Sequence, residues 1–361
     1  MSYEVRQGIS YDAITEAAGV ESEARDCDGA FPGAAFDGLR KLGLIGAPPL
    51  GLKEALPLFR VLAAIGRGDL SVGRIFEGHV NALLLIHVFG RPEQRAHYKT
   101  LAAGGALFGV WNTDMAGFAV ALNDGHLCGK KNFASGVDGL SYALITAETT
   151  RGRQMAMVRV GGRPVDRNWW RPLGMHASGS HVVDFDGVPV SETDLLGEPN
   201  DYLQEPWFTA GAIRFAAVHV GGMHAILDST VAHLRQCKRT ADPHQQHRIG
   251  LMATEVTAGY AWLDYTAAWW AEIGNTSGPD DNAPVIATMN AARTSIERAA
   301  LHVLELAERS VGAAGMIAPH PLERLLRDLR TYLRQPNPDA ALAAVGAAIA
   351  AGLWSPARTP R

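Results

Sequence analysis

The sequence predicts a mainly helical α+β protein built from three consecutive parts. Long stretches on both sides of the centre place apolar residues at helical spacing, whereas residues 107–190 form short alternating runs separated by Gly and Pro turns. We therefore expect an N-terminal helical domain over residues 1–106, a small β-barrel domain over 107–205, and a C-terminal antiparallel four-helix bundle over 206–361.

The overall composition favours a cytoplasmic protein with a sizeable core. The chain has 361 residues, 47% of them hydrophobic and 19% charged, with a net charge of −4. This balance does not favour nucleic acid or an anionic membrane as a partner. Cys27, Cys128 and Cys237 lie far apart without metal or redox spacing, which is typical of reduced thiols. The first ten residues do not resemble a signal peptide, and no run of 18 apolar residues predicts a membrane span.

Four helices are expected before the strands. Apolar spacing predicts them at Phe36–Leu44, Leu56–Ala64 and Val72–Phe89, with a further helix beginning at Arg91–Pro92. The third carries Glu77, His79 and Asn81 within an otherwise apolar stretch. Burial of a carboxylate costs several kcal/mol unless it is paired or faces a wet cavity. These side chains therefore either line a polar cavity or lie on a solvated helix surface.

The central part is organised around residues 111–147. The polar group Asn112-Thr113-Asp114 comes first, Asn123-Asp124-Gly125 predicts a hairpin turn, and the segment Lys131–Gly136 follows. Aromatic and hydroxyl residues alternate here, as they would on a surface that stacks a flat ring and hydrogen-bonds its edge. An ordinary half-buried sheet has the same alternation. Further strands are expected at residues 155–160, 169–175 and 180–190.

The C-terminal part is expected to form four long helices. They are predicted at Thr209–Cys237, Gln245–Ile273, Ala283–Ala313 and Pro321–Arg334. The breaks between them fall at residues 242–243, 277–279 and 312–315. Gly346 weakens any helix in the Ala-rich tail.

Several familiar sites are not predicted. The sequence has no Gly-x-Gly-x-x-Gly after a strand, no phosphate-binding loop of the GxxxxGK[ST] type and no Gly-x-Ser-x-Gly elbow. His244 and His247 are spaced for a metal pair on a helix face, but no third His or carboxylate stands near them in sequence. We interpret them as surface histidines and expect no metal.

Five local patterns, in order, resemble the acyl-CoA dehydrogenase superfamily of FAD flavoproteins over nearly the whole chain. The residues 112–114 resemble the family's V-T-E segment, and 131–136 resemble K-x-W-I-T-N. Residues 173–189 resemble M-G-x-R-x-S…F-x-x-V-x-V-P. Arg214 followed by Gly221-Gly222 resembles the start of the bundle, and residues 322–328 resemble the closing E-R-x-x-R-D helix.

The resemblance implies how FAD would be held. Thr113 would hydrogen-bond the pyrimidine edge of the flavin, Phe133 would pack on the ring, and Ser135 would reach its N5 and O4 region. Trp111, at the start of the same segment, is also expected among the cofactor-binding residues.

The resemblance also implies residues that act across subunits and in the substrate pocket. Arg239 would meet the pyrophosphate of a neighbouring subunit's FAD, and Gly312 and Gly315 would allow close approach of its adenosine end. A homodimer or homotetramer is therefore expected. The acyl pocket would be lined by Glu77, His79 and Arg214.

The departures from the family pattern concern catalysis. Acyl thioester dehydrogenation needs a carboxylate to remove the α-proton, and the family usually places it nine residues after the Arg of the Arg-Asp pair. Pro336 stands there, and Ile213 occupies a second position used by the family. Gly211 replaces the acid that helps to hold CoA, and residues 115–118 lack the Gly-Ser-Asp segment. The flavin scaffold is thus retained, whereas the base and the CoA contacts are not.

Three functions remain open at this point. The first is an FAD-dependent oxidoreductase of the acyl-CoA dehydrogenase type, acting on an acyl-CoA or acyl-carrier thioester, with Glu77 or Asp339 as base and a flavoprotein or O2 as electron acceptor. The second is a flavin-dependent monooxygenase, for which His79, Asn81 and His320 would suit the pocket. The third is a non-catalytic flavin-binding subunit. The substrate and the choice between dimer and tetramer stay undetermined.

Overall fold

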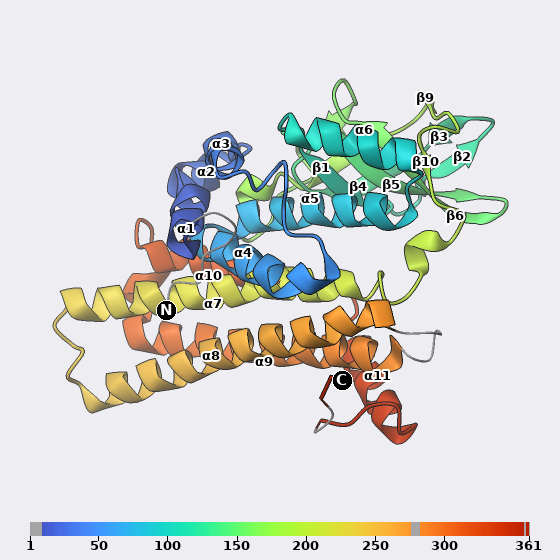
Figure 1. Ribbon diagram of the computed structural model, residues 1–361. Coiled ribbons are helices and arrows are strands. Elements are labelled where there is room, and N and C mark those ends of the chain that lie inside the picture. Colours follow the sequence, from blue (N-terminus) through green and yellow to red (C-terminus); the bar gives the residue numbers. More distant parts are fainter. Residues whose placement is uncertain (1–8, 276–281, 357–358, 361) are drawn as a thin grey trace.

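Helix α5 (Leu70–Phe89) lies at the centre of the molecule, between a β-domain and a helical bundle (Figure 1). A computed structural model describes residues 9–275, 282–356 and 359–360. In Figure 1 the helices of residues 11–41 stand at one end of α5, the sheets lie along one of its sides, and the long bundle helices run along the other. The predicted mainly helical α+β architecture is confirmed.

The N-terminal helices agree with the sequence pattern and add two that it does not predict. The helices are α1 (Tyr11–Gly19), α2 (Ser22–Asp28), α3 (Gly33–Lys41), α4 (Ala55–Gly68), α5 (Leu70–Phe89) and α6 (Pro92–Ala103). Asp69 begins α5 by accepting a hydrogen bond from the amide of Val72, and Pro92 opens α6. The short α1 and α2 lack a long apolar stripe of their own, which explains why the sequence pattern misses them.

Two sheets form the β-domain. The larger contains β1 (Phe108–Trp111), β2 (Ala121–Asn123), β3 (His126–Cys128), β5 (Tyr142–Thr149), β6 (Gly152–Arg159), β9 (Val188–Pro189) and β10 (Leu195–Leu196). The smaller contains β4 (Lys130–Ala134), β7 (Val165–Asp166) and β8 (His181–Asp184). The predicted hairpin is confirmed, because Asn123 pairs with His126 across a turn in which Asp124 and Gly125 have φ of 46° and 74°.

The run 169–175, expected as a strand, is instead an irregular loop that leads into a short 3-10 helix, His176–Ser178. Gly174 explains the difference, because a Cβ atom there would lie 2.3 Å from the carbonyl carbon of Arg327. The loop is therefore shaped by packing on the last bundle helix rather than by pairing with a strand.

The bundle helices are α7 (Ala210–Gln236), α8 (Pro243–Ala271), α9 (Ala283–Val311) and α10 (Pro321–Tyr332), close to the predicted bounds. The predicted break at 277–279 lies outside the described residues. The tail forms a further helix, α11 (Pro338–Ala350), which packs on α9. Gly346 stands in open space within this helix, which forms in spite of the weakening expected from the glycine.

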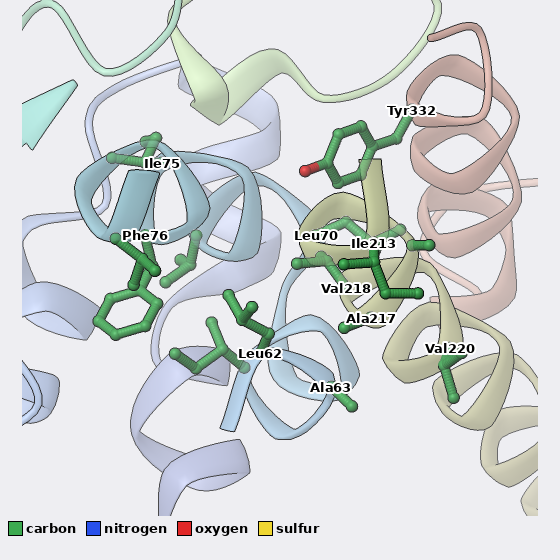
Figure 2. Packing of buried hydrophobic residues seen from close by; sticks show 14 of the residues in the cluster. Leu62, Ala63, Leu70, Ile75, Phe76, Ile213, Ala217, Val218, Val220 and Tyr332 are labelled. Carbon is green, nitrogen blue, oxygen red and sulfur yellow. The ribbon is translucent and has the colours of Figure 1, made fainter. Parts of the chain in front are cut away.

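The core joins α4, α5 and α7. Figure 2 shows Leu62 of α4, Phe76 of α5 and Val218 of α7 among its buried side chains. Glycines permit the close crossing of α4 and α7, because a Cβ atom on Gly221 would lie 2.0 Å from the carbonyl oxygen of Ala63. Among the described helices, α5 and α7 are long and apolar enough to cross a membrane, and 67% and 78% of their apolar windows are buried. Packing in this core accounts for their apolar character.

Candidate functional site

An exposed aromatic ring marks one edge of the β-domain. Phe133 lies within a bulge in β4 and has φ of 51°, a conformation that bulky residues seldom adopt. Its side chain is 48% exposed, while the indole of Trp169 packs against its ring at a centroid distance of 4.9 Å and an angle of 87°. The surrounding fold thus holds an apolar ring outward, which is a reason to look for a ligand there.

Three other residues predicted to bind the cofactor, Trp111, Thr113 and Ser135, lie near Phe133 in the β-domain. The amide of Asn132 donates to the carbonyl of Thr113 at 3.1 Å, which places the exposed Thr113 next to the ring. The buried Trp111 donates from its indole nitrogen to the carbonyl of Ser135 at 3.2 Å. The structure therefore brings Trp111, Thr113, Phe133 and Ser135 together from two strands.

A buried lysine fixes the turn that carries Thr113. The amine of Lys131 donates to the carbonyl of Asn112 at 3.1 Å, to a carboxylate oxygen of Asp114 at 2.5 Å and to the hydroxyl of Thr146 at 3.2 Å. Burial lowers the pKa of Lys131, and the Asp114 carboxylate opposes that shift. The side chain is fully buried, so its role is to shape the site rather than to meet a ligand.

Three serine hydroxyls form a chain behind the aromatic ring. The hydroxyl of Ser180 lies 2.7 Å from that of Ser135 and 2.9 Å from that of Ser178. The amide of Gly136 also donates to the carbonyl of Ser178 at 2.7 Å. Each hydroxyl can donate or accept, so this chain can adjust to a hydrogen-bonding ligand at Ser135. Ser178 and Ser180 belong to the family-like segment, although the sequence does not predict their contact with Ser135.

An ion pair in the middle of α10, between Arg324 and Asp328, holds the loop 173–178 against the bundle. The amide of Met175 donates to Asp328 at 2.6 Å, and Arg324 lies 3.0 Å from Asp69 and 3.3 Å from Asp328. Burial raises the pKa of Asp328 to about 7, with a smaller contribution from the charge of Asp69. This pair is structural and keeps the β-domain in place over α5.

A charged network covers the side of α5 that faces α7. Glu77, only 3% exposed, accepts a hydrogen bond from Arg74 at 2.6 Å and another from Asn81. Asn81 in turn accepts from Arg214 of α7. Glu77 and Arg214, both predicted to line the substrate pocket, thus lie in one network, in which Glu77 is held as the partner of an arginine. Sequence reasoning missed Arg74, although its spacing of three from Glu77 on a helix is the signal that reveals such a pair.

His79, predicted to line the substrate pocket, lies outside this network. It projects from a different side of α5, where its Nε2 lies 2.9 Å from the carbonyl of Ile45 and its Nδ1 accepts from the amide of Phe108 at 3.2 Å. Burial lowers the pKa of His79 to about 4, so the ring is neutral. Both nitrogens are used by backbone groups, and the histidine joins α5 to β1.

Asp339 and His320 also lie outside the charged network of Glu77. Asp339 is exposed in the first turn of α11, and the structure gives it no contact with the network of Glu77. His320 begins α10, where its ring lies 3.0 Å from a nitrogen of His233.

Arg239, Gly312 and Gly315 lie at the end of the bundle where α7 meets α8 and α9 meets α10. Figure 1 shows this end far from the β-domain. Arg239 is half exposed and lies 3.7 Å from Asp242, and Gly312 has φ of 74°. One chain therefore does not bring these residues to Phe133; only a second copy could do so.

Residues 201–333 match the profile of the acyl-CoA dehydrogenase C-terminal domain family. The structure is also similar to butyryl-CoA dehydrogenase from Megasphaera elsdenii, with a TM-score of 0.79 and 18% identity over 97% of this chain and 100% of that one. The chain therefore has the acyl-CoA dehydrogenase fold, and its C-terminal part matches that family's model. The resemblance inferred from the sequence is therefore confirmed at the level of fold.

Three further proteins are similar to the chain. Dibenzothiophene monooxygenase from Rhodococcus erythropolis is 24% identical over 75% of this chain and 74% of the relative. L-evernosamine nitrososynthase from a Micromonospora species is 26% identical over 86% and 81%. The structure of TdsC from Paenibacillus sp. A11-2 with FMN and indole has a TM-score of 0.84 and 22% identity, covering 97% of this chain and 98% of that one.

Proposed function

We propose that the protein is a flavin-dependent monooxygenase, rather than a dehydrogenase of acyl thioesters. The observation that carries the proposal is the state of the carboxylates at the site. Pro336 occupies the position of the usual base, and Glu77 is engaged by Arg74 and Asn81. Removal of an α-proton requires a carboxylate within reach and free to accept it. A monooxygenase has no such requirement, and the similarity to dibenzothiophene monooxygenase supports this choice.

The residues around Phe133 fit a flavin. An exposed aromatic ring can pack on the isoalloxazine, the exposed Thr113 can bond its edge, and Ser135 is backed by further hydroxyls. A bound reduced flavin would supply two electrons, so that one atom of O2 enters the substrate and the other leaves as water. The chain's own residues position the ring, shield it and hold the substrate.

Trp111 and Lys131 would support the flavin ring indirectly, through other residues. The indole of Trp111 fixes the carbonyl of Ser135, and Lys131 fixes the turn that carries Thr113. Both are buried, so they hold Ser135 and Thr113 in place without meeting the ligand. Such support keeps hydrogen-bonding groups at a fixed angle to a flat ring.

We propose FMN as the flavin, in place of the FAD expected from the sequence. The residues assigned to the pyrophosphate and adenosine, Arg239, Gly312 and Gly315, are at the far end of the bundle. FMN needs none of the adenosine contacts, and the similar TdsC was crystallised with FMN. If FAD binds instead, a second copy must supply Arg239. The predicted homodimer or homotetramer is retained as part of that alternative.

The experiment compares two reactions of one preparation. Protein is loaded with FMN or FAD in parallel, the affinities are measured by flavin fluorescence, and the oxidised complex is mixed anaerobically with a panel of acyl-CoAs. We expect tighter binding of FMN and no bleaching by any acyl-CoA. When the reduced complex is mixed with O2, we expect the oxidised flavin spectrum to return, and we expect a substrate to change the time course of that return. Rapid bleaching by an acyl-CoA would restore the dehydrogenase interpretation.

A non-catalytic flavin subunit is the remaining alternative. It predicts that flavin binds but that the reoxidation of the reduced complex is unaffected by any small molecule. Oxygen consumption without any oxygenated product from a broad panel of aromatic and amino-sugar compounds would favour it.

A further inference from the structure

The charged network between α5 and α7 carries one more positive than negative group. Its ionised members are Arg74, Glu77 and Arg214, and Asn81 joins the last two without a charge. Tyr202 lies close enough for the charge of Glu77 to affect it, and burial raises its pKa to about 12, so it is neutral. A buried network with an unbalanced charge is unfavourable unless an ion of opposite sign joins it.

The guanidinium of Arg214 is only partly used. The side chain is 94% buried, because the residue is 6% exposed, yet its Nε alone donates, to Asn81. Within the described residues, its two terminal nitrogens have no hydrogen-bond partner. Burial lowers the pKa of Arg214 to about 10, so it remains charged at neutral pH. The forked edge of this guanidinium is therefore available to a planar anion.

A second polar group, a buried hydroxyl, points toward α5 from α10. Tyr332 is 3% exposed, and its hydroxyl has no partner among the described residues. Figure 2 shows the hydroxyl pointing from α10 toward α5. The charges of Glu77 and Arg74 both act on this hydroxyl, and burial raises its pKa well above the usual value. Tyr332 is therefore a neutral donor directed at the charged network.

The network adjoins the proposed flavin-binding face. A Cβ atom on Gly78 would lie 3.8 Å from Nη1 of Arg74 and 3.9 Å from the Cα of Gly109, which is in the strand that ends at Trp111. One turn earlier, Ile75 packs against Gly136, next to Ser135. Arg74 keeps 25% of its side chain exposed and thus provides an opening to solvent.

We propose that the substrate is a small organic acid whose carboxylate is bound by Arg214, with Tyr332 and Arg74 as further donors. This assignment extends the proposed monooxygenase function, and the identification of the bound acid as the substrate rests on that function. A carboxylate supplies one negative charge, which balances the network, and two oxygens, which match the free edge of a guanidinium. Glu77 then orients Arg74, and Asn81 orients Arg214. Glu77 and Asn81 therefore position the anion through the two arginines without touching it.

The test measures binding, so that it does not depend on oxygen chemistry. Three carboxylates, namely formate, benzoate and indole-2-carboxylate, are compared with their neutral amides by calorimetry, using both flavin-free and FMN-treated protein. At least one acid is expected to bind at least about 30-fold more tightly than its amide, as a buried charge pair requires. If every acid binds no better than its amide, the proposal is wrong.

Two variants and a control identify the residues responsible. Arg214→Gln should abolish the preference for acids, and Tyr332→Phe, which removes a single oxygen atom, should weaken acid binding roughly tenfold. Arg60→Gln removes an arginine paired with Asp264 at the surface and should leave the preference intact. If Arg214→Gln does not fold, Tyr332→Phe decides, and unchanged acid binding in that variant contradicts the assignment.

The outcome also separates this inference from the proposed function. Acid binding that persists in protein unable to bind any flavin would uphold the anion site and refute the monooxygenase. Flavin binding and oxygen reactivity without any preference for acids would do the opposite.

Discussion

Replacement of Glu77 by glutamine tests whether this carboxylate is a structural partner or a catalytic base. The substitution keeps the volume and removes the charge, so Arg74 and Arg214 lose the only carboxylate that the described network offers them. Loss of one partner of a buried ion pair destabilises proteins by about 3–5 kcal/mol. Arg74 retains 25% side-chain exposure, which lets water compensate in part, so we expect about 3 kcal/mol.

Urea unfolding followed by circular dichroism measures this change in the free energy of unfolding. Glu305→Gln is the matched control, because Glu305 forms an exposed i,i+4 pair with Arg309 on α9 and should cost less than about 1 kcal/mol. Wild type and Glu77→Gln should both fail to bleach with acyl-CoAs. A stability loss below about 1 kcal/mol for Glu77→Gln, or acyl-CoA bleaching by wild type that this variant loses, would refute the structural role.

Three further predictions concern the exposed ring of Phe133, the buried carboxylate of Asp328 and the close crossing of α4 and α7. Phe133→Ala should weaken flavin binding roughly three- to tenfold by fluorescence titration, and an unchanged affinity would remove the ring from the site. The pKa of Asp328 is raised to about 7 in the folded state, so its contribution to stability is complete below pH 4 and is lost as the pH rises through 7. Asp328→Asn should therefore flatten the fall in Tm between pH 5 and 8. An unaltered slope of Tm against pH would contradict this prediction. Gly221→Ala should cost about 3 kcal/mol or more because its Cβ atom meets the backbone of Ala63, whereas Gly250→Ala, which meets nothing, should be neutral or slightly stabilising; equal melting temperatures would refute the close crossing.

The long helices and the hairpin could be predicted because their signals are local. The apolar stripes of α4, α7 and α9 extend over several turns, and the residues 123–125 specify a tight turn by their own backbone preferences. The short α1 and α2 depend on the helices that they pack against, and no pattern within such short segments specifies that contact.

The candidate site could be predicted only in part. Residues 111–113 and 133–135 were recognisable from family-like motifs, and the strands that carry them are neighbours in the fold. His79 was assigned to the pocket because it is close to Glu77 in sequence. Closeness in sequence does not reveal that its side chain projects from another side of α5. Tyr332 was missed because its place within reach of the charges of Arg74 and Glu77 depends on the packing of α10 beside α5, which is far away in the chain.

The most direct test of the central claim is an anaerobic mixing experiment followed by the admission of air. FMN-loaded protein is first mixed with acyl-CoAs and then, after reduction, with O2 in the presence and absence of small organic acids. The account predicts no bleaching in the first step and, in the second, transfer of one labelled oxygen atom from 18O2 to an acid. Bleaching by an acyl-CoA at a rate typical of enzymes, about 10 s⁻¹, together with no label in any acid, would contradict it.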